Sequence, residues 1–199
     1  MEMKDKILNA HPEAIPYNYD YGTIYIADFS DRTNSARSVE VSSSPQTCPQ
    51  TGRPMDCAVF HNPAKINLEI VLYDDTSFKD LSGCNIKHCE GTIFPAGEAN
   101  VNWLIMLELK DCLPRNVLNH AAKARRQIFN VYKDLRQRGI LSKEVVYGVY
   151  SCPQKQTSYN DLVFGDIIQQ TRLKRHTGVI FVGTNVVMLV DKNTCVPRV

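Results

Sequence analysis

The chain has 199 residues, of which 43% are hydrophobic and 22% charged, and its formal net charge is +2. This length suits one domain with a substantial core and is short for two full-sized ones, and the composition is ordinary for a globular protein. The small net charge excludes binding to a polyanion through global charge alone, so any such signal has to come from where the charges lie.

The first 54 residues are predicted to form an N-terminal arm, with an edge strand and a polar loop, outside the main core. The alternating aromatic and β-branched residues of "YNYDYGTIYIADF" (17–29) favour a strand around 22–28. The next segment, 30–54, is rich in Ser, Thr, Pro and Arg, which predicts a long surface loop or a partly disordered segment. Residues 55–199 are expected to form a single α/β core domain.

The centre of the chain predicts strands followed by a long helix. Segment 64–75 is ambiguous between strand and helix, whereas 86–112 predicts two strands, at 88–94 and 101–110. In 115–139, apolar residues recur every three or four positions, which predicts an amphipathic helix. These apolar residues are Val117, Ala121, Ala124, Ile128, Val131 and Leu135.

The remaining elements complete an α/β pattern. A strand is predicted at 144–152, a short helix near 160–172, and a hairpin at 178–190 that turns about Gly183-Thr184-Asn185. A strand followed by a long helix and another strand indicates a parallel crossover. The expected fold is therefore α/β, with a central mixed β-sheet flanked by helices.

The strand predicted at 101–110 ends in charged residues. Glu108 and Lys110 are two positions apart, so their side chains project from the same face, at the carboxyl end of the strand where α/β sheets tend to bind ligands. Glu90, on the preceding strand, would lie near Glu108 if the two strands pair as an antiparallel hairpin. The alternative is that Glu108 and Lys110 form an exposed ion pair where the strand emerges into water.

Two carboxylates and a lysine at one sheet edge suit phosphodiester chemistry. Carboxylate oxygens favour Mg²⁺ or Mn²⁺, and a metal-bound water has a lowered pKa that makes it a usable nucleophile. A nearby ammonium can orient that water or stabilise negative charge on a phosphate. The backbone carbonyl of Leu109 could complete the coordination.

Residues 86–152 resemble the core of the PD-(D/E)xK nucleases, the restriction-endonuclease-like superfamily. Glu108-Leu109-Lys110 matches the Glu-x-Lys half of the motif, Glu90 matches the upstream acid, and Gln127 resembles the glutamine often found on the following helix. The resemblance implies a restriction-endonuclease-like core and Mg²⁺- or Mn²⁺-dependent hydrolysis of DNA or RNA. Glu90 and Glu108 would then bind the metal, Lys110 would position or activate water, and Gln127 would join them in the catalytic site.

The chain departs from the family pattern in its acidic residues. The upstream acid of the family is usually Asp, and here it is Glu90, whose extra methylene would shift the metal. Glu98 is a rival for the same role, in a turn with Pro and Gly. Glu69 is the candidate for the further carboxylate that the family often carries on an earlier helix.

Positive charge is concentrated in the predicted helix. Residues 110–138 hold eight basic and two acidic side chains, a local net charge of +6. Such a segment behind a carboxylate cluster is what binding to a phosphate backbone would need, although surface helices also carry many Lys and Arg residues for solvation alone. The predicted nucleic-acid-binding residues are Lys123, Arg125, Arg126 and Lys133, with DNA favoured over RNA as the partner and a homodimer left open.

Seven scattered cysteines indicate reduced thiols, because their number is odd and the N-terminal residues contain no apolar stretch suited to a signal peptide. No segment reaches the roughly 20 apolar residues that span a bilayer, so a soluble, cytoplasmic protein without membrane contact is expected. A zinc site is the alternative use of the cysteines. Its candidate ligands are Cys48, Cys57, Cys84 and Cys89, whose spacings do not match Cys-x2-Cys.

Three functions are compatible with these features. The leading one is a Mg²⁺-dependent nuclease. The second is a catalytically inactive module on the same fold, which binds nucleic acid or a protein partner through its basic helix. The third is a small interaction or immunity-like protein whose charged edges contact a partner.

Overall fold

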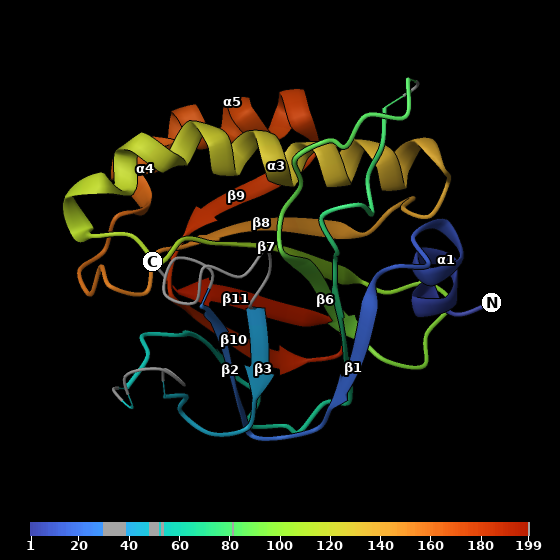
Figure 1. The fold of residues 1–199 in the computed structure, drawn as a ribbon, viewed down its shortest axis with the longest axis horizontal. Helices are drawn as coiled ribbons and strands as arrows, with labels where there is room; N and C mark the ends of the chain where they lie inside the picture. Colours follow the sequence, from blue (N-terminus) through green and yellow to red (C-terminus); the bar gives the residue numbers. More distant parts are fainter. Residues whose placement is uncertain (30–38, 48–51, 53, 81, 199) are drawn as a thin grey trace.

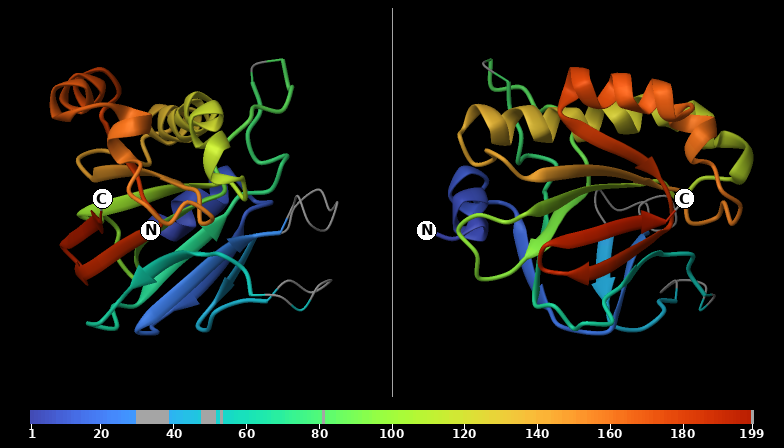
Figure 2. Two further views of the ribbon diagram at one scale, coloured as in Figure 1. Left: turned by 90° about the vertical axis from the view of Figure 1, so that its left-hand side faces the viewer. Right: turned by 180° about the vertical axis from the view of Figure 1, so that it is seen from behind.

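The protein is an α/β fold of three layers, in a computed structural model that describes residues 1–29, 39–47, 52, 54–80 and 82–198. The strands form a six-stranded and a five-stranded sheet. Helices α3 (Val117–Gln137), α4 (Asn160–Phe164) and α5 (Ile167–Thr177) lie in a layer above the first sheet, and the second sheet lies below it (Figure 1). We call these sheets A and B. Two further views show the same stacking (Figure 2). The predicted α/β class is confirmed.

Sheet A is mixed, with an antiparallel half and a parallel half. Its order is β1 (Ile15–Tyr19), β5 (Leu68–Leu72), β6 (Gly91–Pro95), β7 (Trp103–Leu109), β8 (Val145–Ser151) and β9 (Val179–Gly183). The first four strands pair antiparallel, and β8 and β9 continue parallel to β7. The crossovers are α3, then α4 with α5. The parallel crossover expected after the long helix is confirmed.

Sheet B covers the face of sheet A that the helices leave open. Its order is β11 (Thr194–Arg198), β10 (Val186–Asp191), β4 (Ala58–His61), β2 (Thr23–Asp28) and β3 (Val39–Ser42). One apolar core lies between the two sheets and a second lies between sheet A and the helices. The helices therefore flank sheet A on one face, and the β-strands of sheet B supply the apolar surface on the other.

Strand β7 explains the layering. All seven of its residues are buried, so neither face of the strand meets water. Alternate side chains enter different cores: Trp103 and Ile105 pack between the sheets, whereas Leu104 and Met106 pack under the helices. By this alternation Glu108 faces the helical layer.

The N-terminal residues belong to the core and are not an external arm. Helix α1 (Met3–Ala10) buries Met3 and Ile7, four positions apart, in the core under the helices. Strand β2 contributes Ile24 and Ile26 to the core between the sheets. Of the predicted polar loop, residues 30–38, 48–51 and 53 lie outside the described residues, and the stretch between them includes β3.

Helix α3 matches its prediction closely. A short 3-10 turn, Pro114–Asn116, leads into the helix, and the predicted apolar stripe is buried along its full length. Gly139 follows its end with a φ of 68°, a left-handed conformation that favours glycine.

Three other local predictions are settled by the structure. Segment 64–75 contains strand β5 and no helix. The helix near 160–172 is two helices, separated at Gly165, whose φ is 78°, and restarted by Asp166, which caps α5 by accepting from Ile168 N and Gln169 N. The predicted hairpin at 178–190 is wrong: β9 pairs with β8 in sheet A, β10 pairs with β4 and β11 in sheet B, and the turn carries the chain between sheets.

Among the described helices, none has the length and hydropathy needed to cross a bilayer.

Candidate active site

Glu90 and Glu108 lie close together at the carboxyl end of β7. Glu90 immediately precedes β6, whose first residue, Gly91, pairs with Leu107 of β7, and Glu90 N donates to Leu107 O at 2.9 Å. This hydrogen bond falls outside the regular pairing of the two strands, and it holds Glu90 beside the residue that precedes Glu108. The antiparallel pairing expected of these strands is confirmed, and its register brings the two acids together.

Lys110 connects the two carboxylates. Its Nζ lies 2.5 Å from Glu108 Oε1 and 4.0 Å from Glu90 Oε1. Because both distances start at Lys110 Nζ, the two carboxylate oxygens lie at most 6.5 Å apart. Lys110 N also donates to Ser151 O at 2.9 Å, so the backbone of β8 holds this residue at the carboxyl end of sheet A.

Glu108 is the most unusual residue of this cluster, because its side chain is fully buried. Its Oε2 has no hydrogen-bond partner among the described residues. Burial raises the pKa of Glu108 to about 8, against the opposing effect of Lys110. Burial lowers the pKa of Lys110, but the Glu108 and Glu90 carboxylates outweigh it and the net pKa is raised. A buried carboxylate oxygen without a partner costs free energy, and a hard cation would relieve that cost.

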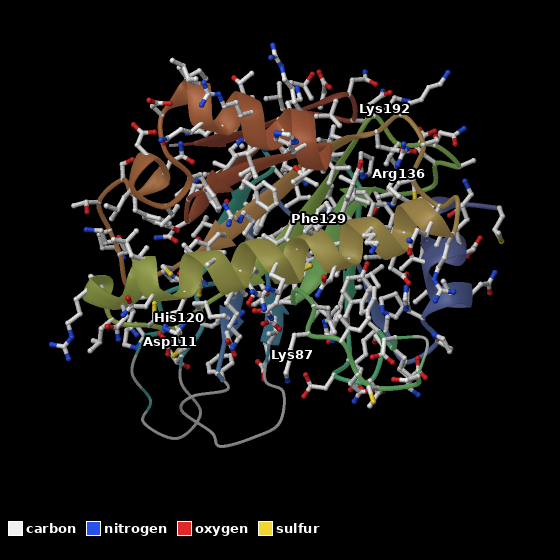
Figure 3. All side chains as sticks on the ribbon, turned by 90° about the horizontal axis from the view of Figure 1, so that it is seen from above. Lys87, Asp111, His120, Phe129, Arg136 and Lys192 are labelled. Atoms are coloured by element: carbon white, nitrogen blue, oxygen red, sulfur yellow. The ribbon has the colours of Figure 1, made fainter. Side chains whose placement is uncertain are left out.

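The cluster opens into a cavity of about 500 Å³. Its walls are the segment between β5 and β6, the residues that follow β7, one side of α3, and the end of β2 in sheet B. Viewed from above, Lys87, Asp111 and His120 lie along one side of α3, while Phe129 and Arg136 lie on the other (Figure 3). The lining residues are Asp28, Tyr73, Asp75, Asn85, Ile86, Lys87, His88, Glu90, Lys110, Asp111, Cys112, His120, Lys123 and Gln127.

Gln127 attaches α3 to the segment that precedes β6 and contains Glu90. Its Nε2 donates to His88 O at 2.7 Å, and Asn130 Nδ2, one turn further along α3, donates to Lys87 O at 2.8 Å. Gln127 is buried, and its Oε1 has no hydrogen-bond partner among the described residues. Of the predicted site residues, Glu90, Lys110 and Gln127 therefore line one cavity, and the buried Glu108 lies behind its ion-pair partner Lys110.

The predicted nucleic-acid-binding residues are divided between two sides of α3. Lys123 lines the cavity, whereas Arg125 lines a separate groove with Val163 and Phe164 of α4. Arg126 and Lys133 are exposed, three and ten positions after Lys123, and so follow the same helical stripe. The structure thus brings Lys123 to the carboxylates and separates Arg125 from them.

Most of the lining residues were not predicted from the sequence, and His120 and Asp28 are two of them. His120 lines the cavity from α3, and its spacing of three from Lys123 and seven from Gln127 could have revealed it, because these positions share one helix face. Asp28 ends β2 in sheet B and exerts an electrostatic effect on Lys110. No local signal points to Asp28, since it lies 62 positions before Glu90 and reaches the cavity through the packing of two sheets.

The remaining acidic candidates have other partners. Glu69 lies on strand β5 and not on a helix, and it pairs with Lys4 at 2.8 Å, so its prediction as a helix carboxylate is wrong. Glu98 pairs with Lys192 at 3.3 Å and does not line the cavity.

Of the candidate zinc ligands, Cys48 lies outside the described residues, Cys84 is exposed and Cys89 is buried. Within the described part of the chain, no group of three or more Cys, His, Asp or Glu side chains has a geometry suited to a metal ion. A metal at Glu90 and Glu108 would therefore need further ligands from backbone, water or substrate.

Comparisons with known proteins add no relative to this description. No family model matches the chain, and the searches of curated proteins and of solved structures returned no significant match.

Proposed function

We propose that this protein is a metal-dependent nuclease with a restriction-endonuclease-like core, which hydrolyses phosphodiester bonds at the cavity beside α3. The observation that carries the proposal is Glu108: a fully buried carboxylate, with one oxygen unpartnered among the described residues and the other 2.5 Å from a lysine that also contacts Glu90. Lys110 and Glu90 both line the cavity, which gives a substrate access to this cluster.

Glu90 and Glu108 would hold the ion, and their oxygens fit Mg²⁺ or Mn²⁺. Mg²⁺ is commonly held by one or two carboxylates together with waters and substrate phosphate, which agrees with the two acids present. When bound, the ion would lower the pKa of a coordinated water and polarise the phosphate.

The side chains of the protein have separate roles. The Lys110 ammonium, held between the two carboxylates, orients a water or stabilises negative charge on the phosphate. Lys123 attracts the phosphate backbone to the cavity entrance, with Arg126 and Lys133 along the same stripe. Gln127 positions the segment that ends in Glu90. Nucleic acid is the proposed partner, with DNA favoured over RNA, and the cytoplasmic location stays a prediction.

A catalytically inactive module that binds nucleic acid or protein is the second candidate. The close contact between Lys110 and Glu108 favours it, because an ion pair of 2.5 Å already neutralises the carboxylate without a metal. The absence of a third acidic, histidine or cysteine ligand among the described residues points the same way.

Cleavage and metal binding separate the two candidates. Wild type is titrated with Mg²⁺ and Mn²⁺ by calorimetry and assayed on single-stranded and duplex DNA and RNA. Glu108→Gln keeps the size of the side chain and should abolish both metal binding and cleavage. Glu98→Gln, at an exposed carboxylate outside the cavity, is the matched control and should resemble wild type. Salt-sensitive nucleic-acid binding without cleavage in wild type would support the inactive module.

A further inference from the structure

Two thiols face each other at the edge of the cavity. Cys112 Sγ lies 3.5 Å from Cys152 Sγ, and the two residues follow the adjacent parallel strands β7 and β8. Cys112 is half-buried and lines the cavity, whereas Cys152 is fully buried. One thiol is therefore accessible to small molecules and the other lies directly behind it.

The surroundings hold the buried thiol in place. Cys152 Sγ donates to Tyr150 Oη at 3.0 Å, and Tyr150 Oη donates to Val117 O at 2.9 Å. Cys152 N donates to Tyr159 Oη at 2.9 Å. A disulfide needs a sulfur–sulfur distance near 2.05 Å, so closure requires an approach of about 1.5 Å, which the less constrained Cys112 can supply.

We propose that Cys112 and Cys152 form a redox-active dithiol that peroxide oxidants convert to an intramolecular disulfide. The Cys112 thiolate attacks hydrogen peroxide, the O–O bond breaks, and the sulfur becomes a sulfenic acid while hydroxide leaves and is protonated to water. Cys152 sulfur then attacks Cys112 Sγ, the S–O bond breaks, and the departing hydroxide takes the Cys152 proton as a second water. The two thiols lose two electrons and two protons in total, and peroxide is reduced to two waters.

The Cys112–Cys152 disulfide would change the position of Lys110 in the cavity. Cys112 N donates to Lys110 O at 2.9 Å, so these residues form one tight turn. Drawing Cys112 toward β8 shifts that turn and displaces Lys110 from the carboxylates. This consequence rests on the proposed nuclease function, whereas the formation of the bond does not.

Peptide mapping tests the bond itself. Wild type is treated with hydrogen peroxide, the remaining thiols are blocked with a maleimide, and the protein is digested without reduction. We expect a cross-linked peptide joining Cys112 to Cys152, with two of the seven thiols lost and no oxygen gained on either residue. A blocked thiol on both residues, at a dose that oxidises the exposed Cys84, would overturn the proposal, as would a cross-link of Cys112 to any other cysteine.

Variants separate the two steps. Cys152→Ala should leave Cys112 as a sulfenic acid that dimedone traps, and Cys112→Ser should leave Cys152 unreacted. Cys195→Ala removes a buried thiol outside this pair and should form the bond as wild type does. Peptide mapping of wild type tests the disulfide by itself, so the test holds even if a variant fails to fold.

Activity provides a separate readout. If the nuclease proposal holds, oxidation should lower the cleavage rate at least tenfold in wild type and dithiothreitol should restore it, with no such change in Cys112→Ser. An inactive reduced protein that still forms the bond would contradict the nuclease proposal and leave the dithiol intact. A cross-link with unchanged activity would refute the coupling to Lys110.

Discussion

Lys110 Nζ lies 2.5 Å from Glu108 Oε1, at the end of a strand whose seven residues are all buried. Removing two charges from water is costly, and their attraction returns that cost only when the geometry is good and the remaining atoms find partners. Here Glu108 Oε2 has none among the described residues. The ion pair is thus energetically incomplete, which is the physical basis of the predictions that follow.

The first prediction concerns stability against pH without divalent metal. Burial raises the pKa of Glu108 from 4.5 to about 8, so between these values the folded protein holds a proton that the unfolded chain releases. This group therefore favours the folded state at low pH and penalises it increasingly as the pH rises toward 8. The unfolding free energy of wild type, relative to Glu108→Gln, should fall by about 1–3 kcal/mol between pH 5 and pH 8. Denaturant unfolding in EDTA measures this difference.

The second prediction concerns the lysine. Lys110→Met keeps most of the apolar side chain but removes the cation that opposes the effect of burial on the pKa of Glu108. The buried carboxyl must then take up a proton or remain an unpaired charge, so at pH 8 the variant should be destabilised by up to about 3 kcal/mol. The double variant Lys110→Met with Glu108→Gln should recover most of that loss, because no buried charge remains. Unfolding free energies of the four proteins form a double-mutant cycle. Simple additivity would show that the pair is not energetically coupled.

The third prediction concerns the contact between α3 and the segment before Glu90. Gln127→Leu removes the side-chain donor to His88 O, at a cost of about 1 kcal/mol. Hydrogen exchange should increase at residues 87–90 and not along the core of α3. Gln137→Leu, at the exposed end of the same helix, is the matched control. Equal exchange in both variants would show that Gln127 does not hold this segment.

The fourth prediction rests on nucleic-acid binding. Lys123→Ala should weaken binding and reduce the slope of log affinity against log salt by about 0.9 for duplex DNA, because one phosphate contact is lost. Arg125→Ala, two positions away but lining a different groove, should leave the slope unchanged. Fluorescence anisotropy at several salt concentrations measures both. A larger effect at Arg125 would place the nucleic acid on the α4 side of the helix.

The local pattern of apolar and polar residues in the sequence predicted several elements well. The apolar stripe of α3, the strand at β2, the two strands β6 and β7 and the parallel crossover to β8 follow from periodicity and chain order, which depend on neighbours in sequence. The same pattern could not distinguish a hairpin from a sheet switch at Gly183-Thr184-Asn185. Both arrangements join two apolar strands by a short turn, and only the available partners decide between them.

The sequence by itself determined which residues could form a site: Glu108 and Lys110 on one face of a strand, Glu90 one strand earlier, and Gln127 on the helix that follows. Tertiary structure decided what surrounds them. The pairing of β6 with β7 brings Glu90 close to Glu108, and the three layers bury Glu108 completely. The packing of sheet B on sheet A brings Asp28 to the cavity. Burial and the approach of distant strands arise from the whole fold, so no local pattern could predict them.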